Sequence, residues 1–281
     1  MLQNASPAYI SKPYSDTESG DSSDDGTGAV DVGGAGQGVA LVVLSGHQGV
    51  VVSADWLAGG DQAVTASWDR TAALWDISSS TMLQTLPGHD MELTGAACHP
   101  GSSRLVVTSS KDSTFRLWDF REAIHSVSVF QGHTESVTCA AFSRTEHIVS
   151  GSDDRTVKVW DLRNMRAPLT NIQTDSPVSP GLVRMRDVDV GCFQVNKVSI
   201  SSSGMVAVAQ DNRHVNIYDI SGAKIARLPR DQGKCHMRMV SSVAWAAELD
   251  TNKPGPSLFS VGFDRIGFGW KMRSKEEQKV L

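Results

Sequence analysis

Residues 151–161 of the 281-residue chain read GSDDRTVKVWD. Asp153 to Arg155 predict a tight turn, and the apolar-rich run after them predicts a short β-strand. Because the segments before the turn are also rich in β-forming residues, we expect this unit to be a small antiparallel sheet. Its strands are expected at Ser136 to Phe142, His147 to Ser152, Thr156 to Leu162 and, outermost, near Leu169 to Gln173.

The Trp-Asp ending of this stretch recurs along the chain. Three units end in it, at Trp75, Trp118 and Trp160, which lie 43 and 42 residues apart. Each of these units opens with a Gly-His pair, at His47, His89 and His133, and these histidines lie 42 and 44 residues apart. Two markers that share a period of about 40–45 residues are typical of the four-stranded blades of a β-propeller.

Two weaker units follow the three strong ones. One ends at Tyr218, where tyrosine takes the tryptophan position. The other ends at Trp270, and its His236 stands nine residues before Trp245, the interval that also separates His133 from Phe142. The chain is therefore predicted to be all-β, with five repeats at about 39–77, 80–120, 126–162, 166–220 and 223–272.

These motifs resemble those of the WD-repeat propeller family over about residues 39–272. The resemblance is carried by GSDDRTVKVWD at 151–161, SWDRT at 67–71, FRLWDFR at 115–121 and GFDR at 262–265. It implies a seven-bladed ring, with two further repeats upstream that this chain does not show. The prediction is thus a WD-repeat β-propeller with five recognisable blades, an incomplete seven-bladed ring.

The ends of the repeat region bear on whether the ring closes. An outer strand is expected at Val39 to Ser45, and the last repeat stops after Trp270 with three strands. Five blades would close if that first strand completed the last blade, and propellers span about 4–8 blades. Since the resemblance implies seven, we expect instead an open array that exposes apolar blade faces and unpaired strand edges.

A set of four polar side chains recurs at fixed offsets in four repeats. The sets are His47, Thr65, Asp69 and Trp75; His89, Thr108, Asp112 and Trp118; His133, Ser150, Asp154 and Trp160; and His236, Ser260, Asp264 and Trp270. Serine, histidine and aspartate together suggest a hydrolase. An enzyme does not need one such set per blade, so we expect a structural network in which Asp, His, hydroxyl and indole satisfy one another, as the resemblance also implies.

The fourth repeat departs from this pattern. Val208, Asn212 and Tyr218 replace the hydroxyl, Asp and Trp, and no Gly-His pair precedes them. About 16 extra residues fall around 176–194, where prolines and glycine break regular structure; they form a surface insertion, a partner-binding loop or an artefact of the gene sequence.

An arginine follows the turn residue in four repeats. These arginines are Arg70, Arg155, Arg213 and Arg265. Because each turn must lie beside its histidine, the four are expected on one rim of the propeller. They are either simply solvated or form a partly cationic surface that suits carboxylates and phosphates.

The net charge of −5 comes entirely from residues 1–38. The neutral remainder argues against general binding of nucleic acids, which needs a clustered basic face. Residues 1–38 have the composition of a disordered acidic segment, in which acids three residues after Ser15 and Ser22 suit acid-directed kinases. Residues 273–281 form a charged C-terminal tail.

The remaining sequence features are those of a reduced, intracellular protein. The four cysteines lack zinc-site spacing, so we expect ordinary thiols, no metal site and no cofactor. No apolar run is long enough for a membrane helix, and the N-terminus does not resemble a signal peptide. The expected location is the cytoplasm, with the nucleus as a second compartment.

Together these features predict a non-catalytic scaffold that binds protein partners through its propeller face and loops. The alternative is a propeller enzyme, or a binder of small ligands, that uses the central channel. By resemblance, a sorting adaptor that reads acidic clusters is a candidate partner.

Overall fold

The computed structural model describes residues 42–120, 126–144, 146–174, 194–228, 235–246 and 257–271. The chain divides into two compact units, Met1–Val43 and Leu44–Leu281, and every described strand lies in the second. The acidic segment, the insertion around 176–194 except for Gln194 and the C-terminal tail therefore lie outside the described residues. None of the described residues forms a helix long and apolar enough to span a membrane.

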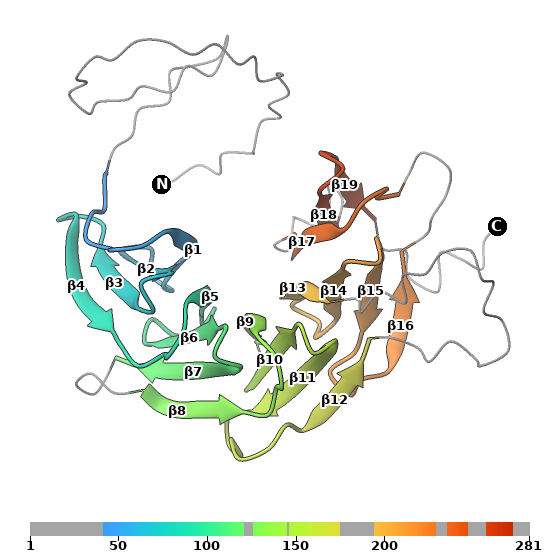
Figure 1. Cartoon of the computed structure of the whole chain (residues 1–281), viewed down its shortest axis with the longest axis horizontal. Coiled ribbons are helices and arrows are strands. Elements are labelled where there is room, and N and C mark those ends of the chain that lie inside the picture. Colours follow the sequence, from blue (N-terminus) through green and yellow to red (C-terminus); the bar gives the residue numbers. More distant parts are fainter. Residues whose placement is uncertain are drawn as a thin grey trace, which may run out of the picture. The chain divides into compact units, whose positions relative to one another are not determined.

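The described strands form five antiparallel sheets, which we call blades one to five (Figure 1). Blade one comprises β1 (Val51–Trp56), β2 (Gln62–Ser67), β3 (Ala72–Asp76) and β4 (Thr81–Leu86). Blade two comprises β5 (Leu93–Cys98), β6 (Leu105–Ser110), β7 (Thr114–Asp119) and β8 (Ser126–Gln131). Blade three comprises β9 (Val137–Phe142), β10 (His147–Ser152), β11 (Thr156–Asp161) and β12 (Thr170–Gln173).

Blade four comprises β13 (Val195–Ile200), β14 (Val206–Gln210), β15 (Val215–Tyr218) and β16 (Lys224–Arg227). Blade five has three described strands, β17 (Val240–Trp245), β18 (Leu258–Gly262) and β19 (Gly267–Trp270). In every blade each strand pairs with the next one along the chain, so tight turns suffice to connect them. The all-β fold and the four strands predicted for the third repeat are confirmed, each within one residue at either end.

Packing between blades explains why the second strands do not alternate. In β6 and β10 five of six residues are buried, and in β14 all five are. A strand that faces a neighbouring blade on each side must be apolar or small on both faces, as in any sheet covered on both sides. These strands accordingly read LVVTSS, HIVSGS and VAVAQ.

The blades follow one another in chain order through their first strands, β1, β5, β9, β13 and β17 (Figure 1). Four apolar clusters fill the four junctions. One joins Val64 of blade one to Leu93 of blade two, and the next joins Val107 to Val137. The other two clusters join blade three to blade four and blade four to blade five. The hydrophobic core of this unit is therefore divided among its junctions.

The series of blades does not close. Among the described residues the substantial contacts between strands of different blades all join blades that follow one another along the chain, and none joins blade one to blade five (Figure 1). The outer strand predicted at Val39 to Ser45 is wrong for its described part, because residues 42–45 belong to no strand. A strand forms only beside a partner, and those residues have none. The expected open array is confirmed, with five blades.

Close packing at a junction can be tested at Gly151 in β10. A Cβ there would meet Cγ1 of Val195 at 2.6 Å and Cγ2 of Val198 at 3.0 Å, both in the next blade. We expect Gly151→Ala to lower the free energy of unfolding by about 1–3 kcal/mol in urea titrations, because overpacking strains a core. Gly267→Ala is the control: its Cβ would meet only ordinary contacts, the nearest at 3.5 Å, so a change within about 0.5 kcal/mol is expected. Equal effects of both substitutions would contradict this account of the junction.

Candidate functional site

The polar set of blade one forms a continuous hydrogen-bonded network. Nδ1 of His47 lies 2.7 Å from Oδ2 of Asp69, and its Nε2 lies 2.7 Å from Oγ1 of Thr65. The indole N–H of Trp75 donates to the same hydroxyl at 2.7 Å. A carboxylate can only accept, so Nδ1 carries the proton and the Thr65 hydroxyl donates to Nε2. One hydroxyl thus links the loop before β1 to the third strand of the blade.

Asp69 also holds the turn in which it lies. It accepts the backbone N–H groups of Gln48 and Thr71, each at 2.9 Å, and the hydroxyl of Thr71 at 2.6 Å. The carboxylate therefore ties the loop before β1 to the β2–β3 turn. Aspartate suits this position because, in turns, its side-chain oxygens can accept hydrogen bonds from backbone amides two residues further along the chain.

The same network recurs in blades two, three and five. His89, His133 and His236 lie 2.7, 2.8 and 2.9 Å from Asp112, Asp154 and Asp264. Their Nε2 atoms lie 2.9, 2.8 and 2.8 Å from the hydroxyls of Thr108, Ser150 and Ser260. The indoles of Trp118, Trp160 and Trp270 donate to those hydroxyls at 2.8, 2.9 and 2.8 Å. The structure thus brings together every set that the sequence predicted.

Hydrogen bonds control the ionisation of the network aspartates. Burial alone would raise the pKa of Asp69 and Asp154, but the bonds that these carboxylates accept outweigh it and hold both pKa values well below the ordinary 3.8. The pKa values of Asp112 and Asp264 are lowered for the same reason. All four aspartates are therefore carboxylates at neutral pH.

For the histidine of blade two, burial is the larger influence on the pKa. Loss of water lowers the pKa of His89 below the ordinary 6.5, although the Asp112 carboxylate opposes that shift. His89 is therefore neutral in the folded protein at pH 7, with one ring nitrogen donating and the other accepting. This is the protonation state that the hydroxyl of Thr108 requires.

The network hydroxyls are poorly placed for catalysis. Thr108 and Ser150 are fully buried and Ser260 is 1% exposed. Each hydroxyl is shared between an imidazole and an indole N–H, so no substrate can reach it without breaking the blade. Two buried cysteines are also unsuited to attack, because burial raises the pKa of Cys98 to about 12 and that of Cys139 as well.

Blade four replaces the network with a different buried pair. Val208 and Tyr218 are buried, and the side chain of Asn212 accepts only the N–H of His214, at 3.0 Å. Asn216 donates to the side-chain oxygen of Gln210 at 2.5 Å within the same blade. The sequence analysis missed these two amides, although Gln and Asn inside the apolar strands VAVAQ and VNIY were a signal.

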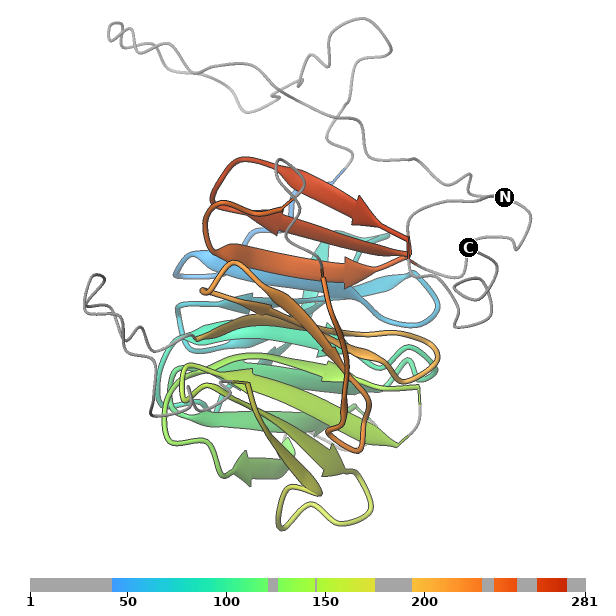
Figure 2. The same cartoon turned by 90° about the vertical axis from the view of Figure 1, so that its right-hand side faces the viewer.

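The four predicted rim arginines occupy the same position in equivalent turns. Arg70, Arg155, Arg213 and Arg265 are exposed, and their φ angles are 69°, 68°, 67° and 64°. Blade two has Ser113 there, with φ 65°. Such left-handed backbone is uncommon in residues other than glycine, asparagine and aspartate. The shared angle therefore shows that the five turns have the same backbone shape. In the side view the strands run between two opposite faces of this unit (Figure 2). All five turns lie on the face that also carries the Gly-His loops. We call it the loop face.

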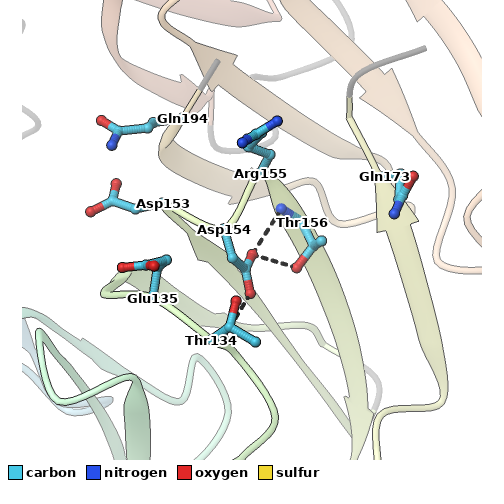
Figure 3. A pocket seen from close by; sticks show the side chains of 8 residues that line it. All are labelled: Thr134, Glu135, Asp153, Asp154, Arg155, Thr156, Gln173 and Gln194. Atoms are coloured by element: carbon cyan, nitrogen blue, oxygen red, sulfur yellow. Dashed lines mark hydrogen bonds between the residues drawn. The ribbon is translucent and has the colours of Figure 1, made fainter. Parts of the chain in front are cut away.

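A pocket opens on the loop face at blade three (Figure 3). Asp154 is held by hydrogen bonds from Thr134 and Thr156, whereas the side chains of Glu135, Asp153 and Gln194 point away from it (Figure 3). Burial, with the nearby carboxylates of Asp211 and Glu135, raises the pKa of Asp153. Arg155 and Gln173 complete the lining of the pocket. Among the described residues no group of His, Cys, Asp and Glu side chains could hold a metal ion.

Comparison with known proteins agrees with this geometry. The family model described as "WD domain, G-beta repeat" matches residues 38–76, 80–119 and 124–161. The chain therefore belongs to the WD-repeat family, as its motifs predicted.

Within that family the chain is similar to WD repeat-containing protein 37. It is 52% identical to the protein of Xenopus laevis and 50% identical to that of Homo sapiens, over 236 residues and 83% of the chain in each case. The chain spans 43% of the length of these relatives. It is also 30% identical to the guanine nucleotide-binding protein subunit beta of Zea mays, over 43% of the chain and 34% of that relative.

Removal of one network histidine should destabilise the fold. We expect His133→Ala to lower the free energy of unfolding by about 1–3 kcal/mol, because Asp154 and Ser150 lose a buried partner. Thr134→Ala is the control, since it changes an exposed neighbour and keeps the backbone N–H that binds Asp154. Thermal melts with a partner-binding assay measure both effects. A His133→Ala variant with an unchanged melting temperature and no binding would refute the structural role.

The stability of the protein should fall as the pH falls. Below about pH 6.5 the unfolded chain takes up a proton at residue 89 that the folded state resists, and below about pH 4 the network aspartates act in the same direction. We therefore expect full stability above about pH 7, a first decline toward pH 5 and a second below pH 4. Melting curves from pH 8 to pH 3 measure it, and His89→Gln should flatten the first decline. Stability that rises from pH 7 to pH 5 would contradict the assignment.

Proposed function

We propose that the chain is a non-catalytic scaffold that binds protein partners through its loop face and loops. The observation that carries this proposal is the use of every Ser-His-Asp-type set for internal hydrogen bonding. In four blades these potentially reactive groups form the hydrogen bonds that hold a loop to a turn. What the loop face offers a partner is therefore a rigid surface of fixed side chains.

The exposed side chains of the loop face are of the kinds that form binding hot spots. Trp68, Met91, Met237 and Phe263 are between 47% and 63% exposed, and the ammonium group of Lys111 lies 5.5 Å from the Trp68 ring centroid. Aromatic residues, methionine and arginine are enriched at protein interfaces. These apolar groups stand among the four arginines, which supports a protein rather than a small molecule as the ligand.

The arginines favour a partner segment that carries carboxylates or phosphates. A guanidinium group can bind either in a bidentate manner, and four such groups in equivalent turns suit a multivalent ligand. The adaptor that reads acidic clusters, suggested by the family resemblance, remains a candidate partner. The acidic stretch at residues 14–25 is a second candidate ligand, and it lies outside the described residues.

The face opposite the loop face supports the same conclusion. Asp55, Cys98, Phe142, Arg144 and Trp245 help to line a pocket there. The carboxylate of Asp55 already accepts the N–H groups of Trp56 and Cys98, at 2.9 and 2.7 Å. With its thiol held protonated, this pocket has no activated nucleophile among its described residues. A channel enzyme is therefore the weaker alternative.

A peptide titration tests the proposed surface. A peptide of residues 14–26 phosphorylated at Ser15 and Ser22 should bind the protein at low salt and weaken at high salt, because exposed ion pairs are screened. Replacing Arg70, Arg155, Arg213 and Arg265 together by alanine should weaken binding at least tenfold. Arg104→Ala combined with Arg163→Ala is the control, because these exposed arginines follow turns at the other end of the strands. No binding at low salt, or equal loss in both variants, would contradict the proposal.

A further inference from the structure

The turn between the second and third strands places one residue of each blade near the inner side of the arc of blades. The backbone N–H of that residue donates to the carbonyl of the residue before the first strand, at 2.9–3.3 Å. The first strands contact one another and lie on the inner side of the arc (Figure 1). We call the five residues that are held beside them the inner ring; they are Trp68, Lys111, Asp153, Asp211 and Phe263.

The arginines of the loop face lie on the outer side of the same turns. Thr174 follows β12, the outermost strand of blade three, and donates its N–H and its hydroxyl to the carbonyl of Arg155, at 3.3 and 2.7 Å. Since the turns share one backbone shape, Arg70 and Arg213 occupy the equivalent position in blades one and four. A segment bound across one of these turns therefore meets an inner-ring side chain and then an arginine.

The inner ring is anionic in blades three and four, where its members are Asp153 and Asp211. Burial, with the nearby carboxylates of Asp211 and Glu135, raises the pKa of Asp153. Carboxylates this close to one another disfavour a further negative charge. An anionic group of a partner is thus repelled from this part of the loop face, although Arg155 and Arg213 lie beside it.

In blades one and two the inner ring offers an aromatic ring and a cation. The Trp68 side chain is 50% exposed, and Nζ of Lys111 lies 5.5 Å from its ring centroid. Met91, which is 47% exposed, lies beside the residue that precedes Lys111, since its carbonyl accepts the Ser110 hydroxyl at 3.1 Å. Trp68 belongs to blade one and Lys111 to blade two, so these groups span an internal junction. We call Trp68, Met91, Lys111 and Arg70 the anchor patch.

The anchor patch is ordered before any partner binds. A Cβ on Gly49 would come within 2.7 Å of the Asp69 nitrogen and 3.2 Å of the Trp68 carbonyl carbon, so the loop before β1 lies directly against the turn that carries Trp68. The Lys111 ammonium group lies over the Trp68 ring, an attraction that restricts both side chains. Among the described residues neither Lys111 nor Arg70 forms an ion pair, so both charges are available to a ligand. A surface that is already ordered loses little entropy on binding.

We propose that the anchor patch is the primary contact for a protein segment in which a large apolar side chain is followed, within two residues, by a carboxylate or phosphate group. The apolar side chain packs on Trp68 and Met91, and the anionic group binds Lys111 and Arg70. The carboxylates of blades three and four exclude the same anionic group from the rest of the inner ring. The assignment rests on the scaffold function proposed above, and it specifies which part of the loop face binds and which order of side chains it reads.

A titration of the full chain with the peptide of residues 14–26, phosphorylated at Ser15 and Ser22, tests the apolar contact. This peptide has the required order, because Tyr14 is followed by Ser15 and Asp16. Trp68→Ala should weaken binding about thirtyfold or more, as expected for a central aromatic contact, whereas Trp68→Phe should stay within about fivefold of wild type. A peptide with Tyr14→Ala should also bind the wild-type chain about thirtyfold more weakly, and Trp68→Ala should weaken its binding little further, because the two rings contact each other.

The same titration tests the charged contact. Arg70→Ala combined with Lys111→Ala should weaken binding about tenfold at low salt and much less at high salt, because salt screens exposed charges. Asp90→Asn combined with Glu92→Gln removes the two carboxylates that flank Met91 in the chain and should tighten binding about twofold to threefold at low salt.

Two controls on the loop face match these substitutions. Met237→Ala removes an equally accessible apolar side chain from blade five, and Arg155→Ala combined with Arg213→Ala removes two positive charges beside the anionic part of the inner ring; each should stay within about threefold of wild type. Circular dichroism confirms that each variant is folded. Equal effects of Trp68→Ala and Met237→Ala, or equal losses in the two double variants that remove positive charge, would overturn the assignment and leave the scaffold function standing. No binding by the wild-type chain at low salt would contradict both.

Discussion

A blade of this protein has two apolar faces, and at each internal junction they are buried against the neighbouring blade. The core is accordingly divided into four clusters, each of which spans one junction. A single sheet of four short strands cannot bury enough surface to be stable by itself, so the stability of each blade depends on its neighbours. That dependence explains the small residues of the second strands, the close approach at Gly151 and the exposed apolar groups at both ends of the series.

Packing sheets this tightly also buries polar groups, and the network resolves that conflict. A loop, a turn and two strands each contribute one member, so a single arrangement satisfies an indole, a hydroxyl, an imidazole and a carboxylate. In blades one, three and five the same bonds fix the turn between the second and third strands, which places Arg70, Arg155 and Arg265 on the loop face. The groups that look reactive therefore build the surface, and the exposed residues beside them are free to bind partners.

Much of this organisation was predictable from the sequence, because one blade repeats with one period. The network sets could be assigned by offset alone, since His133, Ser150, Asp154 and Trp160 have equivalents in three other repeats. What could not be predicted lacks a repeat or depends on a partner in space. The Gln210–Asn216 pair occurs once, and the strand expected at Val39 to Ser45 needed an edge to pair with, which no local pattern reveals. The pocket at Asp153 likewise arises only when blades three and four come together.

The central claim is that each blade owes its stability to the blades on either side. Native-state hydrogen exchange measures this directly, because protection of an amide reports the free energy of opening its blade. We expect the slowest exchange in β6, β10 and β14, whose blades are covered on both faces, and faster exchange in β1, β18 and β19 at the open ends, at protein concentrations where the chain is monomeric. Uniform protection across all five blades, or greater protection in the end blades than in blade three, would contradict the account.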